Sequence, residues 1–235
     1  MARITIYLGH YGSGKTEICL NAALGLAREG VRATLVDLDI VNPYFRSGEQ
    51  RERLMASGVE VVTPTFEGTT VDVPALPARV QSVFADTTRR VIFDVGGDPT
   101  GAAALGRYKP WLERDDVETL CVVNTRRPFT ATARAVADMV RQLEERSRMR
   151  VAGLVCNTNL ARESTAAVLE EGLRVVEEAA AALGVPVASV CGLPHVLDAL
   201  PVPLQDRYSG RLTPLTLYMR PGWLDEEAHK TGNIR

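Results

Sequence analysis

Short apolar runs rich in β-branched residues alternate along the chain with longer segments in which apolar residues recur at helical spacing. The runs are Arg3–Leu8, Ala33–Val36, Val59–Val62, Val91–Val95, Thr119–Val123, Val151–Cys156 and Pro186–Val190. Nearly continuous apolar runs are typical of parallel strands, because both faces of such strands are buried. The alternation therefore predicts an α/β fold, a doubly wound and mostly parallel sheet of about seven strands with helices on both faces.

The two clearest helical segments each have one apolar face. The first runs from Thr16 to Glu29 and is followed by Gly30, a residue type common just after a helix end. The second is closed by Gly184, and its apolar or small residues are Val168, Leu169, Gly172, Leu173, Val175, Val176, Ala179, Ala180 and Leu183. Each segment follows a strand-like run, so both are predicted to connect neighbouring strands of one sheet.

No segment has the composition expected of a linker between domains. The Pro-rich stretches Val73–Pro77 and Leu200–Pro203 are short and flanked by apolar residues, so we expect ordered loops there. A chain of 235 residues can bury a full core as one unit. Residues 1–235 are therefore predicted to form a single domain.

Bulk composition excludes several partners. The 27 basic residues nearly balance the 29 acidic ones, so no strong global field attracts nucleic acid or an anionic membrane. No apolar stretch approaches the roughly eighteen residues of a membrane span, and the chain enters a strand directly, which favours a cytoplasmic protein. The four cysteines lack C-x-x-C spacing and are expected to be buried, reduced thiols.

The segment Gly9–Thr16 fits the phosphate-binding pattern G-x-x-x-x-G-K-[S/T], between the first strand-like run and the first helical segment. Glycines let backbone N–H groups turn toward phosphate oxygens, Lys15 reaches the β- and γ-phosphates, and the Thr16 hydroxyl can hold Mg²⁺. The helix that follows adds its positive N-terminus. Candidate nucleotide contacts are Gly9, Gly12, Ser13, Gly14, Lys15, Thr16 and Glu17.

Two further strand-like runs end in carboxylates at the edge of the sheet where such folds bind ligands. Asp39, shortly after the second run, is the candidate to position water or Mg²⁺, whereas Asp37 is as well explained as a turn former. Asp94 suits Mg²⁺ coordination, usually through water. Gly96 and Gly97 after it would let a loop approach the γ-phosphate and move when that phosphate is lost.

The segment after the sixth run carries the candidate for base recognition. Asn157 has an amide that can pair both a donor and an acceptor with a purine edge. The guanine-selective motif [N/T]-K-x-D occurs nowhere in the chain, so adenine is favoured. The segment Gly192–His195, including Pro194, is expected to form the other wall of the base pocket.

The sequence allows two interpretations each for His10 and for the segment Arg126–Pro128. His10 lies inside the phosphate loop, as a loop filler or as a hydrogen-bond donor to phosphate. The segment Arg126–Pro128 follows the fifth run at the same sheet edge, where it can contact phosphate or a partner or can form a solvated loop.

With these residues in place, the chain resembles the MinD/ParA/CobQ-type branch of the P-loop NTPases over nearly its whole length. Members of that branch couple ATP binding to dimerisation, partner release or ligation chemistry. The resemblance implies that Lys15 and Thr16 bind phosphate and Mg²⁺ and that Asp39 activates water. It also implies that Asp94 supports the metal and that Asn157 reads adenine. ATP and Mg²⁺ are thus the implied cofactors, and a protein partner or a second copy of the chain is the implied partner.

The chain departs from that branch at one position of the phosphate loop. Dimerising members carry an extra lysine early in the loop, which reaches the partner's nucleotide, and this chain has His10 there. The loop is also similar to that of the GTPase metallochaperones for urease and hydrogenase maturation, which lack that lysine. The missing guanine motif and the absence of a Cys/His metal pattern speak against them.

The sequence leaves several functions open. The first is a slow, Mg²⁺-dependent ATPase that acts as a regulatory or maturation switch, with hydrolysis by a water that Asp39 positions. The others are an ATP-dependent ligase or kinase of the cobyrinate-amidating or dethiobiotin-forming type, a metallochaperone-like GTPase, and a nucleotide-binding interaction module with negligible turnover.

Overall fold

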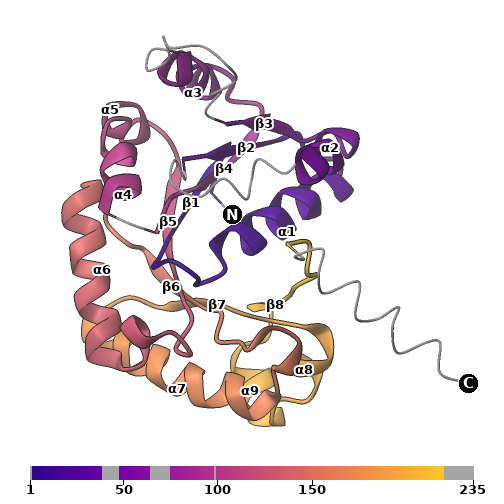
Figure 1. Ribbon diagram of the computed structural model, residues 1–235, viewed down its shortest axis with the longest axis vertical. Coiled ribbons are helices and arrows are strands. Elements are labelled where there is room, and N and C mark those ends of the chain that lie inside the picture. Colours follow the sequence, from indigo (N-terminus) through magenta and orange to yellow (C-terminus); the bar gives the residue numbers. More distant parts are fainter. Residues whose placement is uncertain (1, 39–47, 64–74, 98, 220–235) are drawn as a thin grey trace, which may run out of the picture.

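The computed structural model describes residues 2–38, 48–63, 75–97 and 99–219, and it places them around one central sheet (Figure 1). The sheet has eight strands, all parallel, in the order β3-β2-β4-β1-β5-β6-β7-β8. The strands are β1 (Ile4–Leu8), β2 (Ala33–Asp37), β3 (Glu60–Val62), β4 (Arg90–Asp94), β5 (Val117–Val123), β6 (Gly153–Cys156), β7 (Val187–Gly192) and β8 (Leu212–Pro214). Because β1 lies between β4 and β5, the loop that follows β1 is at the centre of the carboxyl edge.

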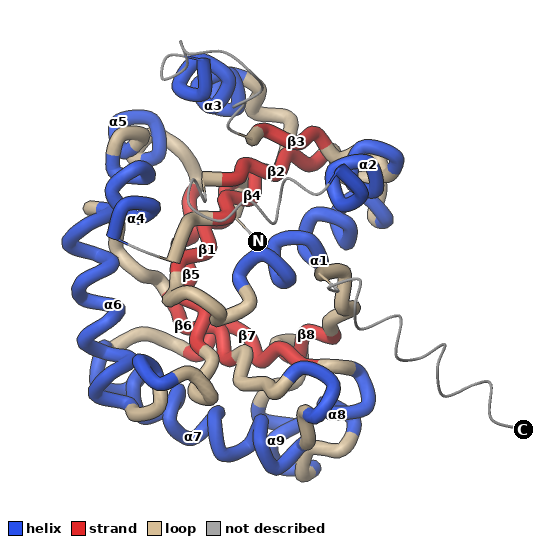
Figure 2. Tube along the Cα trace, viewed as in Figure 1, coloured by secondary structure: helices blue, strands red, loops and turns tan. Residues whose placement is uncertain are grey.

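The helices cover the two faces of the sheet unequally (Figure 2). One face packs on α1 (Lys15–Arg28) and α2 (Gly48–Ala56), through sheet residues such as Leu35 and Ile92. The other face packs on α3 (Ala75–Ala85), α4 (Pro99–Gly106), α5 (Lys109–Leu112), α6 (Ala133–Ser147), α7 (Ala166–Leu183) and α8 (Pro194–Asp198). The short α9 (Val202–Arg207) and the 3₁₀ turns η2 (Pro128–Thr130) and η3 (Ala161–Glu163) complete the described elements.

The predicted doubly wound sheet is confirmed, with three differences. The stretch Val73–Pro77 was predicted as a loop, but its residues from Ala75 onward belong to α3. The sheet contains an eighth strand, β8, whose three residues Leu-Thr-Pro are too short to stand out as an apolar run. The stretch Leu200–Pro203, predicted as a loop, instead leads into α9, which begins at Val202. A proline in the first turn of a helix is tolerated because the N–H that it lacks would have no helical partner there.

The two predicted helices form where the apolar period places them. α1 begins at Lys15, one residue earlier than predicted, and buries Ile18, Leu20 and Leu24 against the sheet. α7 ends at Leu183, and Gly184 follows it in a left-handed conformation with φ of 70°. That conformation has little cost for glycine, so it ends the helix cleanly before β7.

All four cysteines are buried and free, as predicted. Burial raises the pKa of the Cys156 thiol to about 11 and that of the Cys121 and Cys191 thiols to about 12. The thiols therefore stay protonated near neutral pH and pack as small apolar groups. Among the described residues, no helix has both the length and the apolar character needed to cross a bilayer.

Candidate nucleotide-binding site

The loop between β1 and α1 has the backbone conformation that its glycines predict. Gly9, Gly12 and Gly14 have φ values of 145°, 73° and 89°, a region that other residues adopt only with strain. A Cβ on Gly9 would collide with the carbonyl oxygen of Val122 in β5, and one on Gly14 would collide with the Asn157 amide. The loop is therefore pressed against β5 and the residue that follows β6, which fixes its curvature before any ligand arrives.

Lys15 is a buried cation at the centre of this loop. Its side chain is only 6% exposed, and its Nζ donates a hydrogen bond to the His10 carbonyl at 3.2 Å. Among the described residues, no carboxylate lies within ion-pair distance of this ammonium. A buried charge without a counter-ion is costly, so the loop is built to receive an anion.

Next to Lys15, a hydroxyl and two carboxylates converge at the ends of α1, β4 and β2. The Thr16 hydroxyl donates to Asp94 Oδ2 at 2.6 Å. Asp37 is paired in register with Asp94, so both carboxylates lie on the sheet face that α1 covers. The nearby Cys19 thiol is affected by these charges. Burial, Asp94 and Asp37 raise its pKa, while Lys15 lowers it. Hydroxyl and carboxylate oxygens are the ligands that Mg²⁺ prefers.

Ser13 contributes a buried hydroxyl and a carbonyl to this loop. Its hydroxyl oxygen is buried and has no hydrogen-bond partner in the described part of the chain. The Ser13 carbonyl, by contrast, accepts a hydrogen bond of 2.8 Å from Asn157 Nδ2. Because a carbonyl can only accept, the Asn157 amide must turn its NH₂ group toward the loop, and Oδ1 remains as its other polar atom.

The loops after β5 and β6 hold Asn157 in place. The Thr125 amide donates to the Thr158 hydroxyl at 3.2 Å, and the Asn159 amide donates to Asn124 Oδ1 at 3.3 Å. α7 can approach these loops because Gly172 has no side chain, and a Cβ there would overlap Thr158. The surroundings of Asn157 are thus a tertiary assembly of two strand ends and one helix.

The loop between β4 and α4 lies directly against the phosphate loop. A Cβ on Gly97 would lie 2.5 Å from the Tyr11 amide nitrogen and 2.8 Å from the His10 carbonyl carbon. A Cβ on Gly101, in α4, would likewise lie 2.7 Å from the Gly96 Cα. Only glycine permits these two close approaches. Through Gly97, the loop that was predicted to move is in direct contact with the backbone of the phosphate loop.

Three predicted site residues remain, namely Glu17, Pro194 and Asp39. The Glu17 carboxylate faces away from the phosphate loop and accepts from the Tyr218 and Met219 amides at 2.5 Å and 3.1 Å. Pro194 is exposed at the start of α8, just beyond the end of β7. Asp39 lies outside the described residues.

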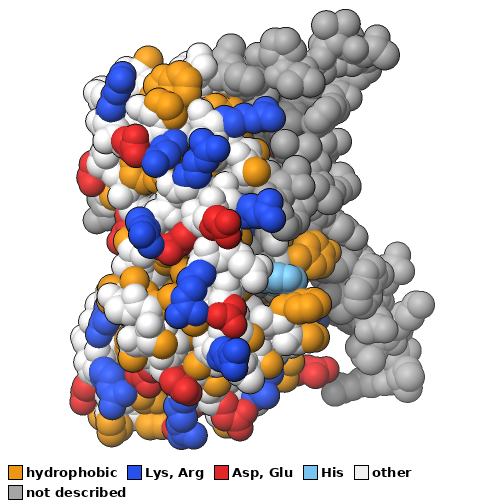
Figure 3. Space-filling view, turned by 90° about the vertical axis from the view of Figure 1, so that its left-hand side faces the viewer, with side chains coloured by type: hydrophobic (Ala, Val, Ile, Leu, Met, Phe, Trp, Pro, Cys, Tyr) orange, Lys and Arg blue, Asp and Glu red, His pale blue; other side chains and the backbone are white. Residues whose placement is uncertain are grey.

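His10 turns toward the neighbouring strand loop instead of crossing the phosphate position. Its ring lies 5.0 Å from the ring of Phe129, which is 69% exposed, and beside it Tyr11 is 64% exposed. Figure 3 shows a histidine flanked by hydrophobic side chains where the described surface meets the grey residues. The mouth of the phosphate loop therefore has an aromatic rim, formed by His10, Tyr11 and Phe129.

Three contributors were missed or left open by the sequence. Asp37 was as well explained as a turn former, yet its register with Asp94 places it beside the proposed metal ligands. Arg127 Nε donates to the Gly12 carbonyl at 3.0 Å, a contact with the phosphate loop itself that the sequence did not predict. Asn124 links the loops after β5 and β6. The sequence did offer one indication that Asp37 belongs to the site, because β2 and β4 both end in an aspartate.

Solved structures of similar fold include the cell division protein FtsY from Thermotoga maritima, at 20% identity and a TM-score of 0.56 over 80% of this chain and 60% of that one. Chloroplast FtsY from Physcomitrella patens is 19% identical, with a TM-score of 0.55 over 81% and 58% of the two chains. The signal recognition particle 54 kDa protein from Aeropyrum pernix, in complex with GDP, is 20% identical, with a TM-score of 0.52 over 80% and 40%.

These likenesses establish the fold, a parallel α/β fold like that of the P-loop NTPases. The chain spans about 60% or less of the length of these structures. No protein-family model matches the chain, and no curated protein matches it. The assignment to the MinD/ParA/CobQ-type branch therefore stays a prediction.

Proposed function

We propose that this protein binds ATP with Mg²⁺ and hydrolyses it slowly, as a regulatory or maturation switch. The observation that carries the proposal is the buried Lys15 ammonium, which no carboxylate neutralises among the described residues. The β- and γ-phosphates supply the anion that this cation needs. The N–H groups of the first turn of α1, including that of Glu17, add donors on the same side.

Thr16 and Asp94 are the proposed Mg²⁺ ligands, since their oxygens already meet at 2.6 Å. Bound there, Mg²⁺ neutralises the charge that develops on the phosphate oxygens during hydrolysis. Asp39 is proposed to position the attacking water. Gly9, Gly12, Ser13 and Gly14 are proposed to surround the phosphates with the loop backbone, and the unpartnered Ser13 hydroxyl adds one donor.

The preference for adenine is proposed from the polarity of Asn157. One N–H of its NH₂ group is used by the Ser13 carbonyl, so the amide keeps its acceptor, Oδ1, together with one further N–H for the base. Adenine offers an exocyclic amino group to such an acceptor, whereas guanine offers a carbonyl oxygen at the equivalent ring position. Pro194 at the start of α8 is proposed as the apolar wall beside the ring.

The switch is proposed to act through the β4–α4 loop. Gly97 packs on the backbone of His10 and Tyr11, so a γ-phosphate that reorders the phosphate loop also displaces this contact. The protein that senses this change is proposed to be a partner or a second copy of the chain.

A second candidate is a GTP-dependent switch, and the comparisons favour it. A structure of similar fold, the signal recognition particle 54 kDa protein, was solved with GDP. Against this candidate stands the same Asn157 acceptor, which would face the guanine O6.

Calorimetric titration of the nucleotide-free protein with ATP and with GTP, each with Mg²⁺, tests both candidates. We expect ATP to bind more tightly than GTP, and Lys15→Ala to weaken ATP binding by at least about tenfold, because a charge-assisted contact is lost. Lys109→Ala is the matched control, since Lys109 is a partly exposed lysine at the start of α5 whose ammonium pairs with Glu113. Equal ATP affinity of the parent and Lys15→Ala would disprove the site, and tighter GTP binding would establish the second candidate.

A further inference from the structure

A cavity of about 440 Å³ lies at the opposite end of α1 from the phosphate loop, between α1, α2 and the segment that follows β8. Its lining residues are Leu24, Ala27, Arg28, Arg53, Ser57 and Tyr218. Leu24 is nearly fully buried and forms an apolar base with Ala27. A volume of this size falls in the range of small-molecule sites, which are commonly apolar with a few convergent polar groups.

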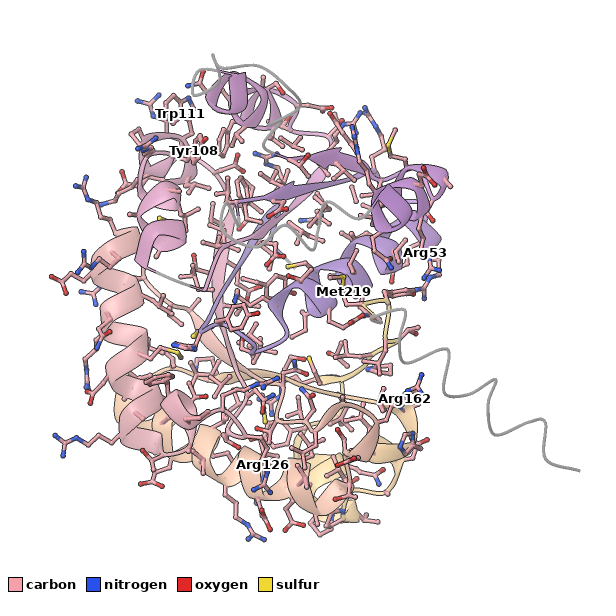
Figure 4. The ribbon with its side chains drawn as sticks, in the orientation of Figure 1. Arg53, Tyr108, Trp111, Arg126, Arg162 and Met219 are labelled. Atoms are coloured by element: carbon pink, nitrogen blue, oxygen red, sulfur yellow. The ribbon has the colours of Figure 1, made fainter. Side chains whose placement is uncertain are left out.

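Two guanidinium groups converge on this cavity from different helices. Arg28 donates from Nη2 to the Tyr218 hydroxyl at 3.1 Å, and Arg53 places its Cζ 5.3 Å from the centroid of the same ring. In Figure 4, Arg53 extends from α2 on the side of α1 where Met219 lies. Within the described ranges, neither arginine forms an ion pair with a carboxylate.

Tyr218 is held in position by contacts outside the cavity. Its amide donates to Glu17 at 2.5 Å, and its carbonyl accepts from Gln50 Nε2 at 2.7 Å. Two residues earlier, Thr216 exchanges two hydrogen bonds with the Asn21 side chain, both 2.9 Å long. The Tyr218 backbone is therefore fixed before a ligand binds, while Arg28 contacts the hydroxyl and Arg53 the ring, which lowers the ordering cost of binding.

We propose that this cavity is a second ligand site, separate from the phosphate loop, for a small molecule with a phosphate group on an aromatic or apolar body. Two guanidinium groups that have no carboxylate partner among the described residues suit a dianion, because each can form charge-assisted hydrogen bonds to phosphate oxygens. The apolar body packs on Leu24, Ala27 and the ring of Tyr218.

Phenyl phosphate is the probe for this site. It is titrated into the full chain carrying Lys15→Ala, so that the phosphate loop does not compete, and binding is followed by ligand-observed NMR. We expect a dissociation constant on the order of 1 mM, as for a small ligand in an open site. Arg28→Gln and Arg53→Gln should each weaken binding by about tenfold. Arg51→Gln, an exposed arginine of α2 outside the cavity lining, should leave it unchanged.

Equal binding by Arg28→Gln, Arg53→Gln and the Lys15→Ala chain would overturn the site, as would the absence of binding to that chain. Inorganic phosphate and phenol separate the two parts of the ligand, and we expect each to bind more weakly than phenyl phosphate. Inorganic phosphate binding as tightly would overturn the role of the apolar body. Thermal unfolding of each variant confirms that it is folded. Phenyl phosphate is also titrated into the parent chain saturated with ATP and Mg²⁺, which gives a second measurement of binding at the cavity.

Discussion

The two ends of α1 differ in how their polar groups are satisfied. At the N-terminal end, Lys15 and Thr16 are enclosed by the sheet and are already bonded to the His10 carbonyl and to Asp94. At the C-terminal end, Arg28 is exposed and contacts only the Tyr218 hydroxyl among the described side chains. The first end is thus organised for one ligand geometry, whereas the second is an open surface that a range of anions can reach.

At the N-terminal end of α1, the side chains of two consecutive residues contact different parts of the structure. Thr16 faces β4, while Glu17 faces the segment after β8 and accepts from the amides of Tyr218 and Met219. Successive residues of a helix point about 100° apart, so adjacent positions of one motif can face the sheet and the surface. Membership of the motif therefore does not by itself assign a side chain to the ligand.

The largest loss of stability is expected when a glycine of the phosphate loop, beside the N-terminal end of α1, is replaced by alanine. Gly9→Ala combines a φ of 145° with a collision against the Val122 carbonyl, so we expect a loss of unfolding free energy above about 3 kcal/mol and no nucleotide binding. Gly30→Ala follows the open end, with a φ of 75° but nothing within 4 Å of the added Cβ, and should lose only about 1 kcal/mol. Urea unfolding compares the two variants, and equal losses would refute the difference between the ends.

The second effect concerns the metal. Thr16→Ala removes the hydroxyl that meets Asp94, so ATP hydrolysis should fall by about a hundredfold and lose its dependence on Mg²⁺. Removal of Mg²⁺ from the parent with a chelator should lower the rate to a similar level. A malachite green phosphate assay over a Mg²⁺ series checks both, and a Thr16→Ala rate that still rises with Mg²⁺ would contradict the proposed ligand.

The third effect concerns base selection. Asn157→Ala leaves the buried Ser13 carbonyl without its donor, which should lower the unfolding free energy by about 1–3 kcal/mol. It also removes the acceptor proposed to read adenine, so the ratio of ATP to GTP affinity should fall toward one. Calorimetry with both nucleotides measures this ratio, and an unchanged ratio would place base selection elsewhere.

The smallest effect is expected at the outer side of α1. Asn21→Ala removes two exposed hydrogen bonds to Thr216 and one to the Glu17 carbonyl, and it should lower the unfolding free energy by about 1 kcal/mol. ATP affinity should stay within about twofold of the parent, since Asn21 faces neither Thr16 nor Asp94. Fluorescence-monitored urea unfolding and calorimetry give the two quantities. A fall in ATP affinity as large as that of Lys15→Ala would show that the outer side belongs to the site.

Most of the fold was predictable because buried parallel strands leave a simple pattern. β1 and the Leu120–Val123 part of β5 are nearly continuous apolar runs, and each needs only its own residues to be recognised. β8 has three residues and gains its stability from pairing with β7, so nothing local distinguishes it. The phosphate loop was equally local, since its glycines, lysine and threonine lie within eight consecutive positions.

The sequence alone determined the sheet, the phosphate loop and the candidate carboxylate Asp94, because each depends on a short pattern of neighbouring residues. Tertiary structure decided which groups meet. It paired Asp37 with Asp94, turned Glu17 outward, and joined Asn157 to Ser13, residues 144 positions apart in the chain. Such contacts depend on strand register and on the packing of distant segments. The direction of the Asn157 amide and the convergence of Arg28 and Arg53 on Tyr218 therefore exist only in the folded chain.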